Sequence, residues 1–234
     1  MDSIIAQKVM SDTLRLDEVV EFAENPEPRC PCVLLLDTSG SMQGTAINAL
    51  NEGLQTFKEE LVKNSLAARR VEVAIVTFDS NVNIVQDFIT ADLFNPPTLS
   101  AQGLTTMGAG IHKALDLITE RKAQYRTNGV AYYRPWIFMI TDGEPQGEPE
   151  PIIEQVKQRI QEDEANKRVA FFCVGVENAN LDSLGYISVR TPLKLTKLNF
   201  TQMFLWLSAS MSAVSHSRLD EQVGLPPVGW GFVQ

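Results

Sequence analysis

The chain has 234 residues, of which 44% are hydrophobic and 21% charged, and its net charge is −9. This length can bury one sizeable core and does not by itself require two domains. The acidic balance disfavours nonspecific binding to nucleic acid or to an anionic membrane, because such binding needs clustered Lys and Arg. No apolar run reaches the roughly 18 residues of a membrane span, and the N-terminus does not look like a signal peptide.

The first predicted element is an N-terminal arm, residues 1–29, that lies on the main fold. Its apolar side chains could pack as a short helix or strand: Leu14, Leu16, Val19, Val20 and Phe22. Pro26 and Pro28 then break regular structure.

An unbroken apolar run predicts a strand from about Cys32 to Asp37, buried on both faces as parallel sheets require. A helix follows from about Thr45, because apolar residues recur there at steps of three and four. They are Ile47, Leu50, Leu54, Phe57 and Leu61. Gly53 weakens this helix but would allow close packing against another element.

Residues 71–78 predict a second strand, and residues 82–85 predict an antiparallel neighbour at the edge of the sheet. Asp79 lies between them and is either a turn residue or a carboxylate in the outer shell of a cation site. A loop then leads to Thr105 and to a helix that buries Ile111, Leu115 and Ile118 on one face.

Residues 136–141 predict another buried strand, which Asp142 and Gly143 follow directly. The later elements are a helix from about Pro149, a strand over 169–176, a short helix or turn at 181–184, a weak strand at 193–195 and a helix from Phe200 to about Val214. The tail, residues 218–234, is predicted to lack regular structure because it is rich in Pro and Gly.

Strands that alternate with helices predict an α/β domain over residues 30–217, with three layers (α/β/α) and Rossmann-like topology. Its central sheet should be mostly parallel, with one antiparallel edge strand. In such sheets ligands bind beyond the carboxyl ends of the strands. Asp37 and Asp142 both lie at the carboxyl ends of strands and Thr105 precedes a helix, so we expect all three at one edge of the sheet.

A cation site is the chemistry that these residues predict. Asp37, Ser39 and Ser41 offer one carboxylate and two hydroxyls at alternate positions. Oxygen ligands suit a hard cation such as Mg²⁺, and Mn²⁺ or Ca²⁺ accept the same ligands. Asp37 taken by itself is also compatible with a simpler role, the capping of a turn or helix. With Thr105 and Asp142 also present, we predict a metal site.

Three motifs together resemble the metal-ion-dependent adhesion site of the von Willebrand factor type A domain family. They are DTSGS at 37–41, GLTTMG at 103–108 and TDG at 141–143. The resemblance covers about residues 30–217. Leu104 stands where many members have a second Gly, which affects the flexibility of the loop but leaves its Thr in place.

The resemblance implies a role for each of five side chains. Ser39, Ser41 and Thr105 would supply hydroxyl oxygens, and Asp37 and Asp142 would bind directly or through water. A carboxylate from a protein partner would complete the octahedron. Neutral hydroxyls leave part of the charge of Mg²⁺ uncompensated, which favours such an anionic ligand.

The sequence is closer still to bacterial stand-alone members, the TerY-like proteins of tellurium-resistance neighbourhoods and the YegL-like proteins. NPEPRCPC at 25–32, YYRPW at 132–136 and MFLWLS at 203–208 carry this likeness. It implies a bacterial stress-response assembly, with a protein phosphatase and a protein kinase encoded nearby as candidate partners.

The leading hypothesis is therefore a non-enzymatic, Mg²⁺-dependent protein-interaction module. The alternative is a Mg²⁺-dependent phosphoesterase or nucleotide hydrolase, because a strand-end Asp also suits such enzymes. However, Ser39 stands where a haloacid-dehalogenase-type phosphatase would have its second Asp, and no G-x-x-x-x-G-K-[ST] loop is present. A third hypothesis is a structural subunit in which the ion only stabilises the fold.

The cysteines indicate the compartment. Cys30, Cys32 and Cys173 are an odd and sparse set, which is typical of a reducing environment rather than of a disulfide-built module. We expect buried thiols and a cytoplasmic protein.

Overall fold

The fold is that of a computed structural model, which describes residues 20–219 and 221–233. Within these residues a single sheet has seven strands, in the order β3-β2-β1-β4-β5-β6-β7. The strands are β1 (Cys30–Asp37), β2 (Val71–Phe78), β3 (Val82–Thr90), β4 (Trp136–Thr141), β5 (Ala170–Val176), β6 (Leu193–Leu195) and β7 (Gly231–Val233).

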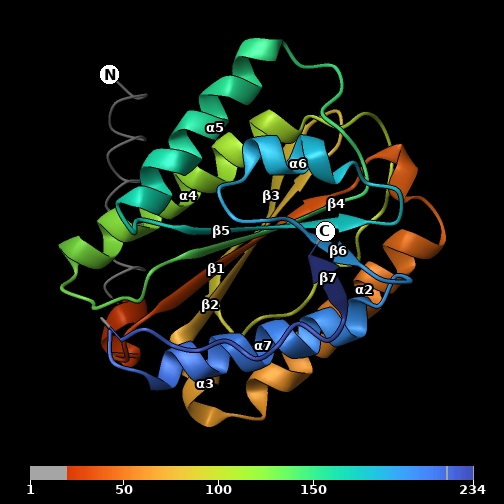
Figure 1. The fold of residues 1–234 in the computed structure, drawn as a ribbon. Coiled ribbons are helices and arrows are strands. Elements are labelled where there is room, and N and C mark those ends of the chain that lie inside the picture. The colour runs from red at the N-terminus through yellow and green to blue at the C-terminus, as the bar shows by residue number, and fades with distance from the viewer. Residues whose placement is uncertain (1–19, 220, 234) are drawn as a thin grey trace, which may run out of the picture.

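Helices cover both faces of this sheet (Figure 1). They are η1 (Gly40–Met42), α2 (Thr45–Val62), α3 (Ser65–Arg70), α4 (Met107–Thr127), α5 (Glu150–Ala165), α6 (Leu181–Ile187) and α7 (Phe200–His216). α2, α3 and α7 lie on one face, and α4, α5 and α6 lie on the other (Figure 1). Two clusters of buried apolar side chains fill the spaces between these layers. The predicted three-layer α/β/α architecture is confirmed.

The sheet is mostly parallel, as predicted. β1 pairs in parallel with β2 and β4, and β5 pairs in parallel with β4 and β6. β3 is the predicted antiparallel edge strand. The opposite edge holds a second antiparallel strand, β7, which the sequence patterns did not predict.

The prediction that the tail lacks regular structure is wrong for its last residues, because they form β7. A Cβ at Gly231 would lie only 2.5 Å from the carbonyl oxygen of Lys194, so glycine permits the close approach of β7 to β6. Trp230, which is buried, anchors this strand, and its ring centroid lies 5.7 Å from that of Trp206. Trp206 Nε1 in turn donates a hydrogen bond to the carbonyl oxygen of Pro226 (2.8 Å).

The strands next to the predicted site are buried along their whole length. Every residue of β1 and of β2 is buried, as expected for central strands that helices cover on both faces. The predicted apolar stripe of α2 faces the core. Gly53 allows α7 to pack closely, because a Cβ there would lie 2.5 Å from the Phe204 ring.

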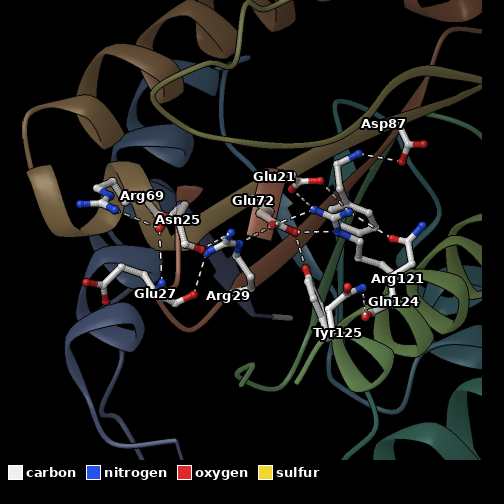
Figure 2. Close-up of polar contacts among 12 residues, drawn as sticks. Glu21, Asn25, Glu27, Arg29, Arg69, Glu72, Asp87, Arg121, Gln124 and Tyr125 are labelled. Carbon is white, nitrogen blue, oxygen red and sulfur yellow. Dashed lines mark hydrogen bonds and ion pairs between the residues drawn. The ribbon is translucent and has the colours of Figure 1, made fainter. Parts of the chain in front are cut away.

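A buried ionic cluster joins the amino ends of β1 and β2 to α4 (Figure 2). Glu72 accepts hydrogen bonds from Arg29 Nε (2.8 Å), from Arg121 Nε (3.0 Å) and from the hydroxyl of Tyr125. Arg121 also forms an ion pair with Glu21. Glu72 and Arg29 are fully buried, so their charges compensate each other inside the protein.

The described residues of the N-terminal arm pack on this cluster. Residues 20–24 are helical, and Phe22 is buried. Its ring meets the ring of Tyr125 edge-on, and the guanidinium of Arg121 lies 4.9 Å from its centroid. The prediction that Val20 packs on the main fold is wrong, because its side chain is exposed. The remaining predicted contacts of the arm lie outside the described residues: Leu14, Leu16 and Val19.

Two further predictions concern the cysteines and the membrane. Cys30, Cys32 and Cys173 are free and buried, which confirms the prediction of buried thiols. Burial raises the pKa of Cys32 to about 12, so this thiol stays protonated and is a poor nucleophile. No helix in the described residues is long and apolar enough to cross a membrane.

Candidate metal centre

Two of the predicted ligands meet because β1 and β4 are parallel neighbours. Asp37 is the last residue of β1, and Asp142 directly follows β4, so both lie at the same edge of the sheet. Thr141, the last residue of β4, donates a hydrogen bond from its hydroxyl to Asp37 Oδ2 (2.5 Å). The carboxyl ends of these two strands therefore form the floor of the site.

Asp37 is a buried carboxylate whose hydrogen bonds come from neutral donors. Besides the Thr141 hydroxyl, the backbone N–H of Ser39 donates a hydrogen bond to its Oδ1 (2.8 Å). Burial raises the pKa of Asp37 to about 6, and the negative charge of Asp142 adds to this shift. Hydrogen bonds from Ser39 and Thr141 act in the opposite direction. A cation beside this carboxylate would stabilise its ionised form.

The two serine hydroxyls connect the carboxylates. Ser39 Oγ lies 3.0 Å from Ser41 Oγ, and Ser41 Oγ donates a hydrogen bond to Asp142 Oδ1 (2.7 Å). Ser39 is buried, Asp142 is half-buried and Ser41 is exposed. The oxygens thus extend from the buried floor to the solvent, which leaves the outer side of the site open.

Thr105 approaches from a separate loop. A Cβ built at Gly143 would lie 3.5 Å from Thr105 Oγ1 and 3.9 Å from Asp37 Oδ2, so both oxygens flank the same point. Two backbone hydrogen bonds join the turn after Asp37 to the segment before Thr105. They run from Gly40 N to the Gly103 oxygen (3.0 Å) and from Gln102 N to the Thr38 oxygen (2.8 Å). All five predicted ligands therefore converge at one edge of the sheet.

These ligands fit a hard divalent cation. The converging atoms are hydroxyl and carboxylate oxygens from three loops, as Mg²⁺ prefers. In the described residues no group of three or more His, Cys, Asp or Glu side chains is placed to hold a metal, so the hydroxyls are essential to the set. Mg²⁺ bound here would supply positive charge beside Asp37 and an electrophilic position for an oxygen ligand from outside.

Comparison with known proteins agrees with this geometry. The sequence profile of the von Willebrand factor type A domain matches residues 32–202, which is more than half of the chain. The chain belongs to the von Willebrand factor type A domain family. No curated protein matches the sequence of this type A domain.

Solved structures share the fold of this type A domain at low sequence identity. The vWF domain of the type V pili tip protein Mfa5 from Porphyromonas gingivalis is 12% identical, with a TM-score of 0.60, over 85% of this chain and 99% of that chain. The pilus adhesin SpaC from Lactobacillus rhamnosus GG is 14% identical, with a TM-score of 0.62, over 82% and 31%.

Proximal thread matrix protein 1 from the mussel byssus is 14% identical to this chain, with a TM-score of 0.55, over 80% of this chain and 49% of that one. The type A domain thus spans about half the length of this structure. At such identities the likeness shows the fold alone.

The sequence patterns did not assign roles to two residues beside the site. Thr141 binds the carboxylate of Asp37, and its place in the strand-end TDG motif was the available signal. Glu148 contacts the start of α4, which no local pattern indicates because its partners are 39 and 40 residues away. Asp79 had two predicted roles, and the structure supports that of a turn residue, since its Oδ1 accepts a hydrogen bond from Asn81 N (2.8 Å).

Proposed function

We propose that this type A domain is a non-enzymatic module that binds another protein through Mg²⁺. Asp37, Ser39, Ser41, Thr105 and Asp142 hold the ion, directly or through water. A Glu or Asp carboxylate of the partner completes its coordination. The observation that carries this proposal is the convergence of these five side chains at one edge of the sheet, with the outer side open.

The charge balance of the site supports an anionic partner. Three of the five proposed ligands are neutral hydroxyls, and one oxygen of Asp142 accepts a hydrogen bond from Ser41. Mg²⁺ commonly keeps waters and uses only one or two protein carboxylates, so an exchangeable position remains. A carboxylate in that position gains more from the ion than a neutral group does.

The first experiment measures Mg²⁺ binding by isothermal titration calorimetry on the wild type and on Asp142→Ala. We expect binding by the wild type and its loss in the variant. Asp116→Ala is the matched control, because Asp116 is an exposed acid on α4 whose side chain pairs with Arg159. This control should bind Mg²⁺ as the wild type does.

The second experiment tests the bridge to a partner. Proteins retained by the immobilised wild type in Mg²⁺ should be lost in EDTA and with Asp142→Ala, and retained with Asp116→Ala. A partner that binds equally well in EDTA would contradict a metal-bridged contact. Mg²⁺-dependent hydrolysis of a phosphoester that Asp37→Ala abolishes would instead favour the phosphoesterase.

We further propose that the partner belongs to a bacterial, cytoplasmic stress-response assembly of the TerY-like kind, and that it is a protein phosphatase or a protein kinase. The motivation is the sequence likeness of residues 25–32 and 132–136 to that group. These segments also lie together, since Arg29 N donates a hydrogen bond to the Ala131 oxygen (2.9 Å) and Tyr133 N donates one to the Arg29 oxygen (2.8 Å). Co-purification of a protein phosphatase or a protein kinase with this chain tests the assignment, and absence of both from the complex would contradict it.

A further inference from the structure

The first turn of α4, which begins two residues after Thr105, is capped by a residue from another loop. Glu148 lies just before α5, and its two carboxylate oxygens accept hydrogen bonds from Gly108 N and Ala109 N (2.7 Å each). Free N–H groups at a helix start are normally satisfied by the side chain of the N-cap residue. Here a carboxylate from the loop that contains Asp142 has this role.

The local N-cap residue is engaged elsewhere. Thr106 makes no side-chain capping bond, and its hydroxyl donates a hydrogen bond to the carbonyl oxygen of Asp79 (2.8 Å). The start of α4 therefore depends on Glu148 for two of its N–H groups. An acidic group is also favoured there by the helix dipole.

A second contact joins the same two loops. Gln146 N donates a hydrogen bond to the carbonyl oxygen of Thr105 itself (2.9 Å). Gly108 provides the space for this close approach, because a Cβ there would lie 2.5 Å from Ile152 and 3.2 Å from Glu148 Oε2. Three hydrogen bonds thus connect the backbone of Thr105 and of the first turn of α4 to the segment that follows Asp142.

We propose that Glu148 is a positioning residue of the metal site, which fixes the Thr105 hydroxyl relative to Asp142 and so sets the affinity and selectivity for the cation. This inference rests on the proposed function of the same five ligands. Glu148 itself binds the backbone of α4 and acts through the Thr105 loop rather than as a ligand.

The choice of cation follows from the stiffness of this connection. Mg²⁺ requires nearly octahedral ligands at about 2.0–2.1 Å, whereas Ca²⁺ accepts more ligands at about 2.3–2.6 Å in flexible arrangements. If the two loops separate or move independently, the affinity of the site for Mg²⁺ falls more than its affinity for Ca²⁺. Glu148 therefore favours the smaller ion.

The test is calorimetric titration of Mg²⁺ and of Ca²⁺ into the wild type, Glu148→Gln and Glu148→Ala. We expect the Kd for Mg²⁺ to rise about tenfold or more in Glu148→Ala, as is typical when a supporting residue of a metal site is lost. Glu148→Gln should have a smaller effect, because its amide oxygen still accepts one hydrogen bond. The Kd for Ca²⁺ should change less, so the preference for Mg²⁺ should fall.

Asn64→Ala is the matched control for lost helix capping. Asn64 Oδ1 caps α3 by accepting hydrogen bonds from Leu66 N (3.1 Å) and Ala67 N (3.0 Å), away from the metal site. Glu148→Ala and Asn64→Ala should each lose some thermal stability, but Asn64→Ala should keep the wild-type affinity and selectivity for Mg²⁺. Equal Mg²⁺ affinity in Glu148→Ala and the wild type would overturn the proposal.

Hydrogen exchange separates this inference from the proposed function. In EDTA, the amide of Gln146 should exchange faster in Glu148→Ala than in the wild type, since the two loops are no longer held together. The exchange rate of this amide should be unchanged in Asn64→Ala. If the wild type binds no Mg²⁺, the proposed function fails; if Gln146 keeps its protection in Glu148→Ala, the positioning role fails.

Discussion

The buried charged groups at the two ends of β1 differ in the charge of their neighbours. At the amino end, the ionic cluster pairs Arg29 with Glu72, and Arg121 with Glu72 and Glu21. At the carboxyl end, Asp37 is equally buried, but the charge that most affects it is another acid. Burying a charge costs free energy unless it is compensated. The chain supplies this compensation at the amino end, and we infer that a cation supplies it at the carboxyl end.

The pKa shifts reflect the same difference. Burial alone would lower the pKa of the Arg121 guanidinium, but hydrogen bonds and charge from Glu72 raise it. For Asp37 burial is the largest effect on the pKa, and it favours the neutral form. The amino end stabilises its charges within the fold, whereas at the carboxyl end burial and the charge of Asp142 both disfavour the ionised form of Asp37.

The largest expected effect is that of Glu72→Ala at the amino end. Two buried guanidiniums would lose their shared carboxylate, which should reduce the free energy of unfolding by about 3–5 kcal/mol. Urea unfolding in EDTA measures this loss. Glu60→Ala is the control, because Glu60 pairs with the exposed Lys63 at the surface and should contribute at most about 1 kcal/mol.

The second prediction concerns pH at the carboxyl end. The pKa of Asp37 is raised in the folded protein, so without metal its contribution to stability is largest below its unfolded value near 4 and is lost as the pH rises to about 6. The difference in unfolding free energy between the wild type and Asp37→Asn should therefore change by about 2–3 kcal/mol between pH 4 and pH 7 in EDTA, in favour of the variant. Parallel stability curves for the two proteins would contradict this account.

The third prediction returns to the amino end. Glu21→Gln removes one partially exposed partner of Arg121 but leaves Glu72 in place. We expect the free energy of unfolding to fall by about 1 kcal/mol, because solvent screens this pair. Urea unfolding under the same conditions measures the change. Loss of the same magnitude as in Glu72→Ala would show that the helical segment at residues 20–24, rather than the buried pair, maintains the cluster.

The smallest effect on stability is expected for Ser41→Ala. Ser41 is exposed, and its substitution should change the free energy of unfolding in EDTA by no more than about 0.5 kcal/mol. Its Mg²⁺ affinity should nevertheless fall by about tenfold or more. Thermal melts with and without Mg²⁺ measure both effects, and a large loss of stability in EDTA would make the hydroxyl a structural group.

Much of the fold could be predicted because local patterns in this sequence agree with the final packing. The apolar runs of β1 and β4 required burial on both faces, and the stripe from Ile47 to Leu61 required a helix against the sheet. The strand β7 could not be predicted in this way. Its pairing depends on the contact between Gly231 and Lys194, two residues that lie far apart in the sequence.

The sequence alone determined the types of candidate ligand and the elements that carry them, because strand-end Asp and Ser residues can be recognised locally. Only the tertiary structure decided how these ligands meet. The parallel pairing of β1 with β4 brings Asp37 to Thr141, and Glu148 ties the loop after Asp142 to the first turn of α4. The buried partners of Glu72 could not be predicted from the sequence either. Charges and hydrogen-bonding groups find distant partners only when the sheet and its helices bring them together.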